Sequence, residues 1–226
     1  MSIQIIGAGF PRTGTMTLKK ALETLGYNQT YHFKNLLAKP SDLKYWLELD
    51  TNSTTNFEKL FDGYAASVDF PGYSYYKILL EKYPTAKVIL THRTFESWYE
   101  STYSTIWKAG PQTPLAKKEL KAKMLANPNL KNTFDCIKFM RSTHLEKKFG
   151  GDFTSKTHTE KIFLQHIEEV TDFVPKENLL IYNVSEGWTP LCNFLSLPLP
   201  KVPFPHLNKK EDFHQMVKKM IESSAK

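Results

Sequence analysis

The sequence predicts an α/β fold, a parallel sheet flanked by helices with a helical lid region, and three observations predict it. Short apolar segments typical of buried strands alternate along the chain with segments whose apolar residues recur at helical spacing. The first strand, at residues 3–6, leads through a glycine-rich turn directly into a helix. A lysine-rich helical stretch at residues 107–173 interrupts the alternation, and we expect it to form a lid and wall over the sheet.

Strands and helices follow one another in an order typical of a doubly wound sheet with right-handed crossovers. Turn residues or a proline mark the ends of most elements. We expect strands at residues 3–6, 64–72 with the closing turn, 87–92 and 178–182, with a short extended piece at 31–33. We expect helices before Gly26, within 41–61 with a break near Asn52, at 72–83, from Thr94 onward, three within 107–173, near 188–195, and near 213–221.

Composition restricts the class of protein. The 226 residues suffice for a single domain, 1–226, whose hydrophobic core is large enough to be stable without disulfide bonds or a structural metal. Hydrophobic residues make up 41% and charged residues 23%, and no apolar run reaches membrane-spanning length, so we expect a soluble protein with no membrane partner. The sequence shows no signal peptide and has two widely spaced cysteines, so we expect a cytoplasmic location. The net charge of +7 suits an anionic ligand, and because the lysines are scattered, nucleic-acid binding is a minor alternative.

The turn after the first strand has the composition of an anion-binding loop. Gly7, Gly9 and Gly14 make it turn-rich, and the N–H groups of the following helix's first turn have no partners within the helix. Arg12 adds a permanent positive charge with several donors. Hydroxyl groups come from three alternate positions, Thr13, Thr15 and Thr17. We interpret the loop as one that holds a phosphate or sulfate group; an ordinary strand–helix turn is the alternative.

Two known nucleotide loops fit this segment poorly. A dinucleotide fingerprint would need glycine where Arg12 stands. The interval from Gly9 to Gly14 matches a P-loop, but Thr15 replaces the lysine and Met16 replaces the hydroxyl that would hold Mg²⁺. The loop is therefore P-loop-like, and it leaves open a group transfer from an anionic donor without a metal. A metal-dependent small-molecule kinase on a degenerate P-loop is an alternative.

A second anion-binding element follows the strand at 87–92. Arg93 stands at the end of that strand, and Ser101 follows eight residues later on the next helix. An arginine and a serine so placed can converge on one phosphate. A surface arginine and a buried serine are the alternative.

Two residues are candidates for a general base. Asp69 stands at the end of the second strand, where ligands gather in open α/β sheets. It could instead cap the helix at 72–83. His32 could face the same pocket, or it could be a hydrogen-bonded structural residue.

The loop at residues 9–22 resembles the 5′-phosphosulfate loop of sulfotransferases that use 3′-phosphoadenosine 5′-phosphosulfate (PAPS). Its Arg-Thr-Gly-Thr form resembles a divergent branch that includes the oxamniquine-activating sulfotransferase. The interval from Arg93 to Ser101 resembles the 3′-phosphate element of the same family, and residues 187–195 and 203–208 resemble the C-terminal signature of that branch. The resemblance covers residues 5 to about 213. Better-known members have lysine where this chain has Arg12, which leaves the proton source for the leaving group open.

The resemblance implies a reaction and a set of roles. The reaction is transfer of a sulfuryl group from PAPS to a small-molecule alcohol or phenol, without a metal and without a nucleic-acid partner. Asp69 would be the base, with His32 in reserve, and Arg12 would stabilise the leaving oxygen. The 5′-phosphosulfate would be held by Arg12, Thr13, Gly14, Thr15, Met16 and Thr17, and the 3′-phosphate by Arg93 and Ser101, with Lys209 within reach. A non-catalytic nucleotide-binding protein on the same fold is a further alternative.

Overall fold

A computed structural model describes residues 2–108 and 113–207. Within these residues the chain forms a sheet of five strands in the order β2-β3-β1-β4-β5, and every neighbouring pair is parallel. The strands are β1 (Ile5–Gly7), β2 (Thr30–Tyr31), β3 (Ala66–Ser67), β4 (Lys87–Thr91) and β5 (Leu179–Tyr182).

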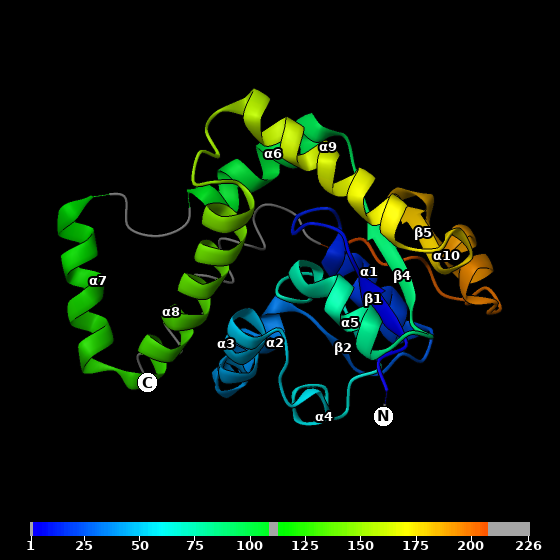
Figure 1. Cartoon of the computed structure of the whole chain (residues 1–226), viewed down its shortest axis with the longest axis horizontal. Coiled ribbons are helices and arrows are strands. Elements are labelled where there is room, and N and C mark those ends of the chain that lie inside the picture. Colours follow the sequence, from blue (N-terminus) through cyan, green and yellow to red (C-terminus); the bar gives the residue numbers. More distant parts are fainter. Residues whose placement is uncertain (1, 109–112, 208–226) are drawn as a thin grey trace.

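Helices make up most of the remaining described chain (Figure 1). The α-helices are α1 (Thr15–Thr24), α2 (Phe33–Ala38), α3 (Leu43–Asn52), α4 (Phe57–Leu60), α5 (Tyr76–Lys82), α6 (Phe95–Thr102), α7 (Pro114–Ala126), α8 (Pro128–Met140), α9 (Lys156–Phe173) and α10 (Trp188–Leu195). The shorter elements are the 3₁₀ turns η1 (Pro40–Asp42), η2 (Gly72–Tyr75), η5 (Lys176–Asn178) and η6 (Val184–Glu186), and the π-helical segments η3 (Tyr103–Trp107) and η4 (Arg141–Lys148).

The central strands β1 and β4 have apolar residues on both sides because both faces of the sheet are covered there. Ile5 packs in one core with residues of α1 and α10, whereas its neighbour Ile6 packs in a larger core with residues of α5, α6 and α9. In β4, Ile89 belongs to the first core, and Val88 and Leu90 belong to the second. This alternation follows the two-residue period of a strand, and burial on both faces is usual for parallel sheets.

The predicted fold class is confirmed, and the strand set is extended by one. The segment at 31–33 was expected only to be extended, but Thr30 and Tyr31 form an edge strand that pairs with β3. The second predicted strand shortens to two residues because the chain turns at Asp69, which has a φ of 66°.

The helical stretch expected at 107–173 is present in its described part. Figure 1 shows α7 and α8 as a pair beside the sheet, and α9 runs back across it. The helix predicted near 213–221 and Lys209 lie outside the described residues.

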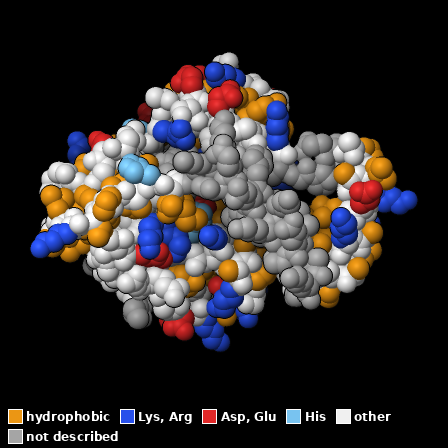
Figure 2. Space-filling view, turned by 180° about the vertical axis from the view of Figure 1, so that it is seen from behind, with side chains coloured by type: hydrophobic (Ala, Val, Ile, Leu, Met, Phe, Trp, Pro, Cys, Tyr) orange, Lys and Arg blue, Asp and Glu red, His pale blue; other side chains and the backbone are white. Residues whose placement is uncertain are grey.

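On the face opposite to that of Figure 1, basic and acidic side chains are interspersed among apolar ones in the described part of the surface (Figure 2). Among the helices described, none combines the length and apolar character that crossing a bilayer requires.

Candidate functional site

Glycine at position 9 allows the loop between β1 and α1 to lie close to the end of β4. A Cβ atom on Gly9 would lie 2.1 Å from Oγ1 and 2.5 Å from the carbonyl oxygen of Thr91, so only glycine fits there. Gly14 has a φ of 102° and is the N-cap of α1. Because Gly14 has no side chain, it cannot cap the N–H groups of the first helical turn, and these groups can bind an anion.

The hydroxyl groups of Thr13 and Thr17 are engaged with the main chain. Thr13 Oγ1 donates to the carbonyl of Phe10 at 2.6 Å and lies 2.6 Å from Thr91 Oγ1. Thr17 Oγ1 donates to the carbonyl of Leu207 at 3.0 Å and accepts from the N–H of Leu207 at 3.1 Å. Each hydroxyl has one proton to donate, and the N–H of Thr13 also donates to the carbonyl of Phe10, at 3.3 Å. In this arrangement a contribution to anion binding falls to the backbone N–H of Thr17.

Thr15, His32 and Asp69 meet at the edge of the sheet where the strands end. Thr15 Oγ1 donates to Asp69 Oδ1 at 2.8 Å. His32 Nε2 lies 3.5 Å from Asp69 Oδ2 and 3.4 Å from Thr15 Oγ1. The side chain of Asp69 therefore faces α1, and η2 begins without a side-chain cap. Asp69 caps the next helix only through its backbone carbonyl, which accepts a hydrogen bond from the N–H of Tyr73 at 2.9 Å.

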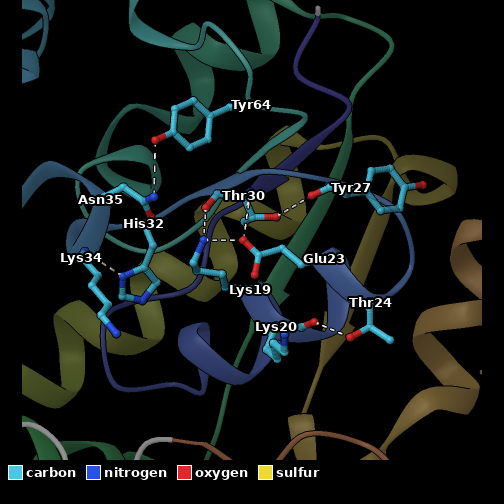
Figure 3. Close-up of polar contacts among 10 residues, drawn as sticks. All are labelled: Lys19, Lys20, Glu23, Thr24, Tyr27, Thr30, His32, Lys34, Asn35 and Tyr64. Atoms are coloured by element: carbon cyan, nitrogen blue, oxygen red, sulfur yellow. Dashed lines mark hydrogen bonds and ion pairs between the residues drawn. The ribbon is translucent and has the colours of Figure 1, made fainter. Parts of the chain in front are cut away.

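The hydrogen bonds of His32 define its tautomer. Nδ1 accepts from the backbone N–H of Lys34 at 3.1 Å, which caps α2 (Figure 3). Burial lowers the pKa of His32; the charge of Asp69 opposes this shift, and Lys19 adds to it. The neutral ring therefore has its proton on Nε2, the nitrogen that faces Asp69.

Arg12 joins the loop to the second anion-binding element. Arg12 Nε donates to Ser101 Oγ at 3.1 Å, and Arg93 Nη1 donates to the carbonyl of Arg12 at 3.3 Å. Arg93 Nη2 also donates to Ser97 Oγ, and burial lowers the pKa of Arg93. The structure thus brings Arg12, Arg93 and Ser101 together, although Arg93 and Ser101 are linked through Arg12 rather than to each other by these bonds.

A family model described as a sulfotransferase domain matches residues 4–213. The chain belongs to the sulfotransferase family. This membership confirms the resemblance that the loop and the Arg93–Ser101 interval predicted. The sulfotransferase is also similar to "Ava biosynthesis cluster protein M" of Aspergillus versicolor, with 30% identity over 222 residues that cover 91% of this chain and 80% of the relative.

Two side chains of this sulfotransferase contact the loop without having been predicted to do so. Trp98 Nε1 donates to the carbonyl of Pro11 at 2.9 Å, and His166 Nε2 donates to the carbonyl of Ala8 at 2.8 Å. Trp98 is buried on α6, and no local pattern in the sequence indicates a partner for its N–H group. Nothing in the sequence links His166 to a carbonyl 158 residues away.

Proposed function

We propose that this sulfotransferase transfers the sulfuryl group of PAPS to the hydroxyl group of a small-molecule alcohol or phenol. The main observation behind the proposal is that the side chains of Thr15, His32 and Asp69 lie close together, beside the loop that contains Arg12. A candidate base and a candidate anion-binding loop then lie at one edge of the sheet, where α/β proteins bind their ligands.

Donor binding would use two positions on this edge. The first-turn N–H groups of Gly14, Thr15, Met16 and Thr17, with the positive end of the α1 dipole, suit the 5′-phosphosulfate. Arg93 and Ser101, which both contact Arg12, suit the 3′-phosphate. Lys209 remains a predicted contributor. We expect no metal requirement, because a sulfuryl group carries less charge than a phosphoryl group and the loop supplies fixed dipoles.

In the proposed reaction Asp69 accepts the hydroxyl proton while the acceptor oxygen attacks sulfur. The bond between sulfur and the bridging oxygen breaks, and its electron pair stays on that oxygen as 3′,5′-adenosine bisphosphate leaves. Arg12 stabilises this charge by hydrogen bonding and keeps its own proton.

His32 would orient the base rather than replace it. Its Nδ1 is occupied by the N–H of Lys34, and its Nε2 carries the proton that faces Asp69. In this tautomer the ring has no nitrogen free to accept the proton of a substrate, which favours Asp69 as the base.

Two measurements test the proposal. In the first, 3′,5′-adenosine bisphosphate is added without Mg²⁺ and thermal unfolding is followed; a ligand at 100 times its dissociation constant adds about 2.7 kcal/mol of stability. In the second, transfer of ³⁵S from labelled PAPS is measured over a panel of alcohols and phenols. Stabilisation by ATP-Mg²⁺ alone would favour the kinase, and binding of the bisphosphate without transfer to any acceptor would favour a non-catalytic protein. The cytoplasmic location remains a prediction for fractionation to test.

A further inference from the structure

The two peptide groups that flank Arg12 are each held by one side chain. The carbonyl before Arg12, that of Pro11, accepts from the indole N–H of Trp98 at 2.9 Å. The carbonyl of Arg12 itself accepts from Arg93 at 3.3 Å. The backbone of Arg12 is thus restrained on both sides.

Arg12 requires such restraint because its φ is 73°. This left-handed conformation is unfavourable for residues other than glycine, and it persists where the surroundings determine it. Since Pro11 and Arg12 share a planar peptide, fixing the Pro11 carbonyl also fixes the direction of the Arg12 N–H on the opposite side.

We infer that Trp98 is a positioning residue for binding of the sulfuryl donor. It holds Arg12 in its left-handed conformation, in which the guanidinium lies beside Ser101. Trp98 and Ser101 are three residues apart on α6 and so lie on one face of the helix. One binds the backbone next to Arg12 and the other binds its side chain. The inference rests on the proposed function, since it assigns Arg12 to the donor.

Without the indole N–H, the peptide between Pro11 and Arg12 can rotate and relieve the left-handed φ. Rotation turns the Pro11 carbonyl and the Arg12 N–H, and the backbone no longer fixes the Arg12 side chain beside Ser101. Arg12 then reaches the donor less often, and donor affinity falls.

Trp46 provides a matched control. Both Trp46 and Trp98 are 0% exposed, and each donates one indole N–H within the protein. The partner of Trp46 is the hydroxyl of Tyr31 at 3.2 Å, not the loop. Phenylalanine at either position removes one hydrogen bond and a similar volume, so both variants are expected to lose stability.

The experiment compares the affinities of wild type, Trp98→Phe and Trp46→Phe for 3′,5′-adenosine bisphosphate by calorimetric titration, with melting temperatures measured in parallel. We expect Trp98→Phe to weaken binding about tenfold, which corresponds to about 1.4 kcal/mol. We expect Trp46→Phe to change it less than about twofold while its melting temperature falls by a similar amount.

A second comparison separates positioning from packing. In an Arg12→Ala background, Trp98→Phe should cost less than about twofold in affinity, because the residue through which Trp98 acts is gone. If Trp98→Phe does not fold, benzothienylalanine at position 98 replaces the N–H by sulfur and keeps the bicyclic ring. Equal losses for the two tryptophan variants, or the same loss with and without Arg12, would overturn the inference. A wild-type protein that does not bind the bisphosphate would overturn the donor assignment as well, which distinguishes the two failures.

Discussion

Two buried histidines next to the anion-binding loop should make the protein sensitive to acid. The rings of His166 and His144 lie 4.2 and 5.7 Å from the ring of Phe10, centroid to centroid. His166 donates to the carbonyl of Ala8, and His144 Nδ1 is hydrogen-bonded to the hydroxyl of Tyr73. Burial lowers the pKa of His166 to about 4 and that of His144 to about 3.

Nearby charges modify these shifts without reversing them. His166 lowers the pKa of His144, and Lys148 lowers the pKa of both rings. Glu169 raises the pKa of His166 and Lys77 lowers it, whereas the hydrogen bond to Ala8 raises it. Desolvation is the largest contribution for both rings, so both are neutral in the folded protein at neutral pH.

The sign of the pH dependence follows from proton binding. In the unfolded chain each histidine titrates near its ordinary pKa of 6.5, so below that pH the unfolded state binds more protons than the folded state. The stability present above pH 6.5 is therefore lost as the pH falls towards 4 and 3. Each histidine contributes a slope of about 1.4 kcal/mol per pH unit, which gives about 2 kcal/mol each, or about 4 kcal/mol for the pair, between pH 6.5 and 5.

Urea unfolding at pH 7 and pH 5, followed by tryptophan fluorescence, measures this loss. In His144→Phe the loss of stability between the two pH values should be smaller by about 2 kcal/mol, because one titrating ring is gone. Trp46→Phe is the control: it alters a buried ring that has no titratable group and should keep the full difference. The reasoning would be refuted if the wild-type protein were equally stable at pH 7 and pH 5. It would also be refuted if His144→Phe lost as much stability as the wild type between these two pH values.

Three further predictions concern the loop and its ligands. Asp69→Asn should keep bisphosphate affinity within about twofold and lower sulfuryl transfer by about 10²-fold or more, since general-base catalysis contributes that much; unchanged transfer would remove Asp69 from the mechanism. Arg93→Ala should weaken the binding of 3′,5′-adenosine bisphosphate much more than that of 5′-AMP, and an equal loss in two parallel titrations would show that Arg93 does not contact the 3′-phosphate. Gly14→Ala should destabilise the protein in urea by more than Gly26→Ala, since the φ values are 102° and 98° but only the Cβ of Gly14 meets a neighbour, Val184 Cγ2 at 2.7 Å. Equal destabilisation in those two variants would mean that Val184 moves aside without cost.

Patterns along the chain predicted the sheet well because its signals are local. The run at 87–92 has the apolar, β-branched character of a buried strand, and β4 forms there. β2 was harder to predict because two residues carry no periodicity. Thr30 and Tyr31 become a strand only through their pairing with β3.

The candidate site was predicted as a set of residues but not as a set of contacts. The motifs indicated Arg12, Asp69 and Arg93, and the topology brings the ends of their strands to one edge. The bond from Thr15 to Asp69 joins residues 54 positions apart, and it depends on the exact turn at each strand end. The engagement of the Thr17 hydroxyl by Leu207 spans 190 positions, and no local pattern reports such a pairing.

The parallel sheet also has a practical consequence for surface chemistry. All strands point their carboxyl ends toward the candidate site, so Thr85, an exposed residue that precedes β4, lies at the far rim. Both cysteines of the chain, Cys136 and Cys192, are buried, and burial raises the pKa of each thiol. A Thr85→Cys variant would therefore offer one reactive thiol for a fluorophore or a resin linker, and the immobilised protein would present its ligand-facing edge to the solution.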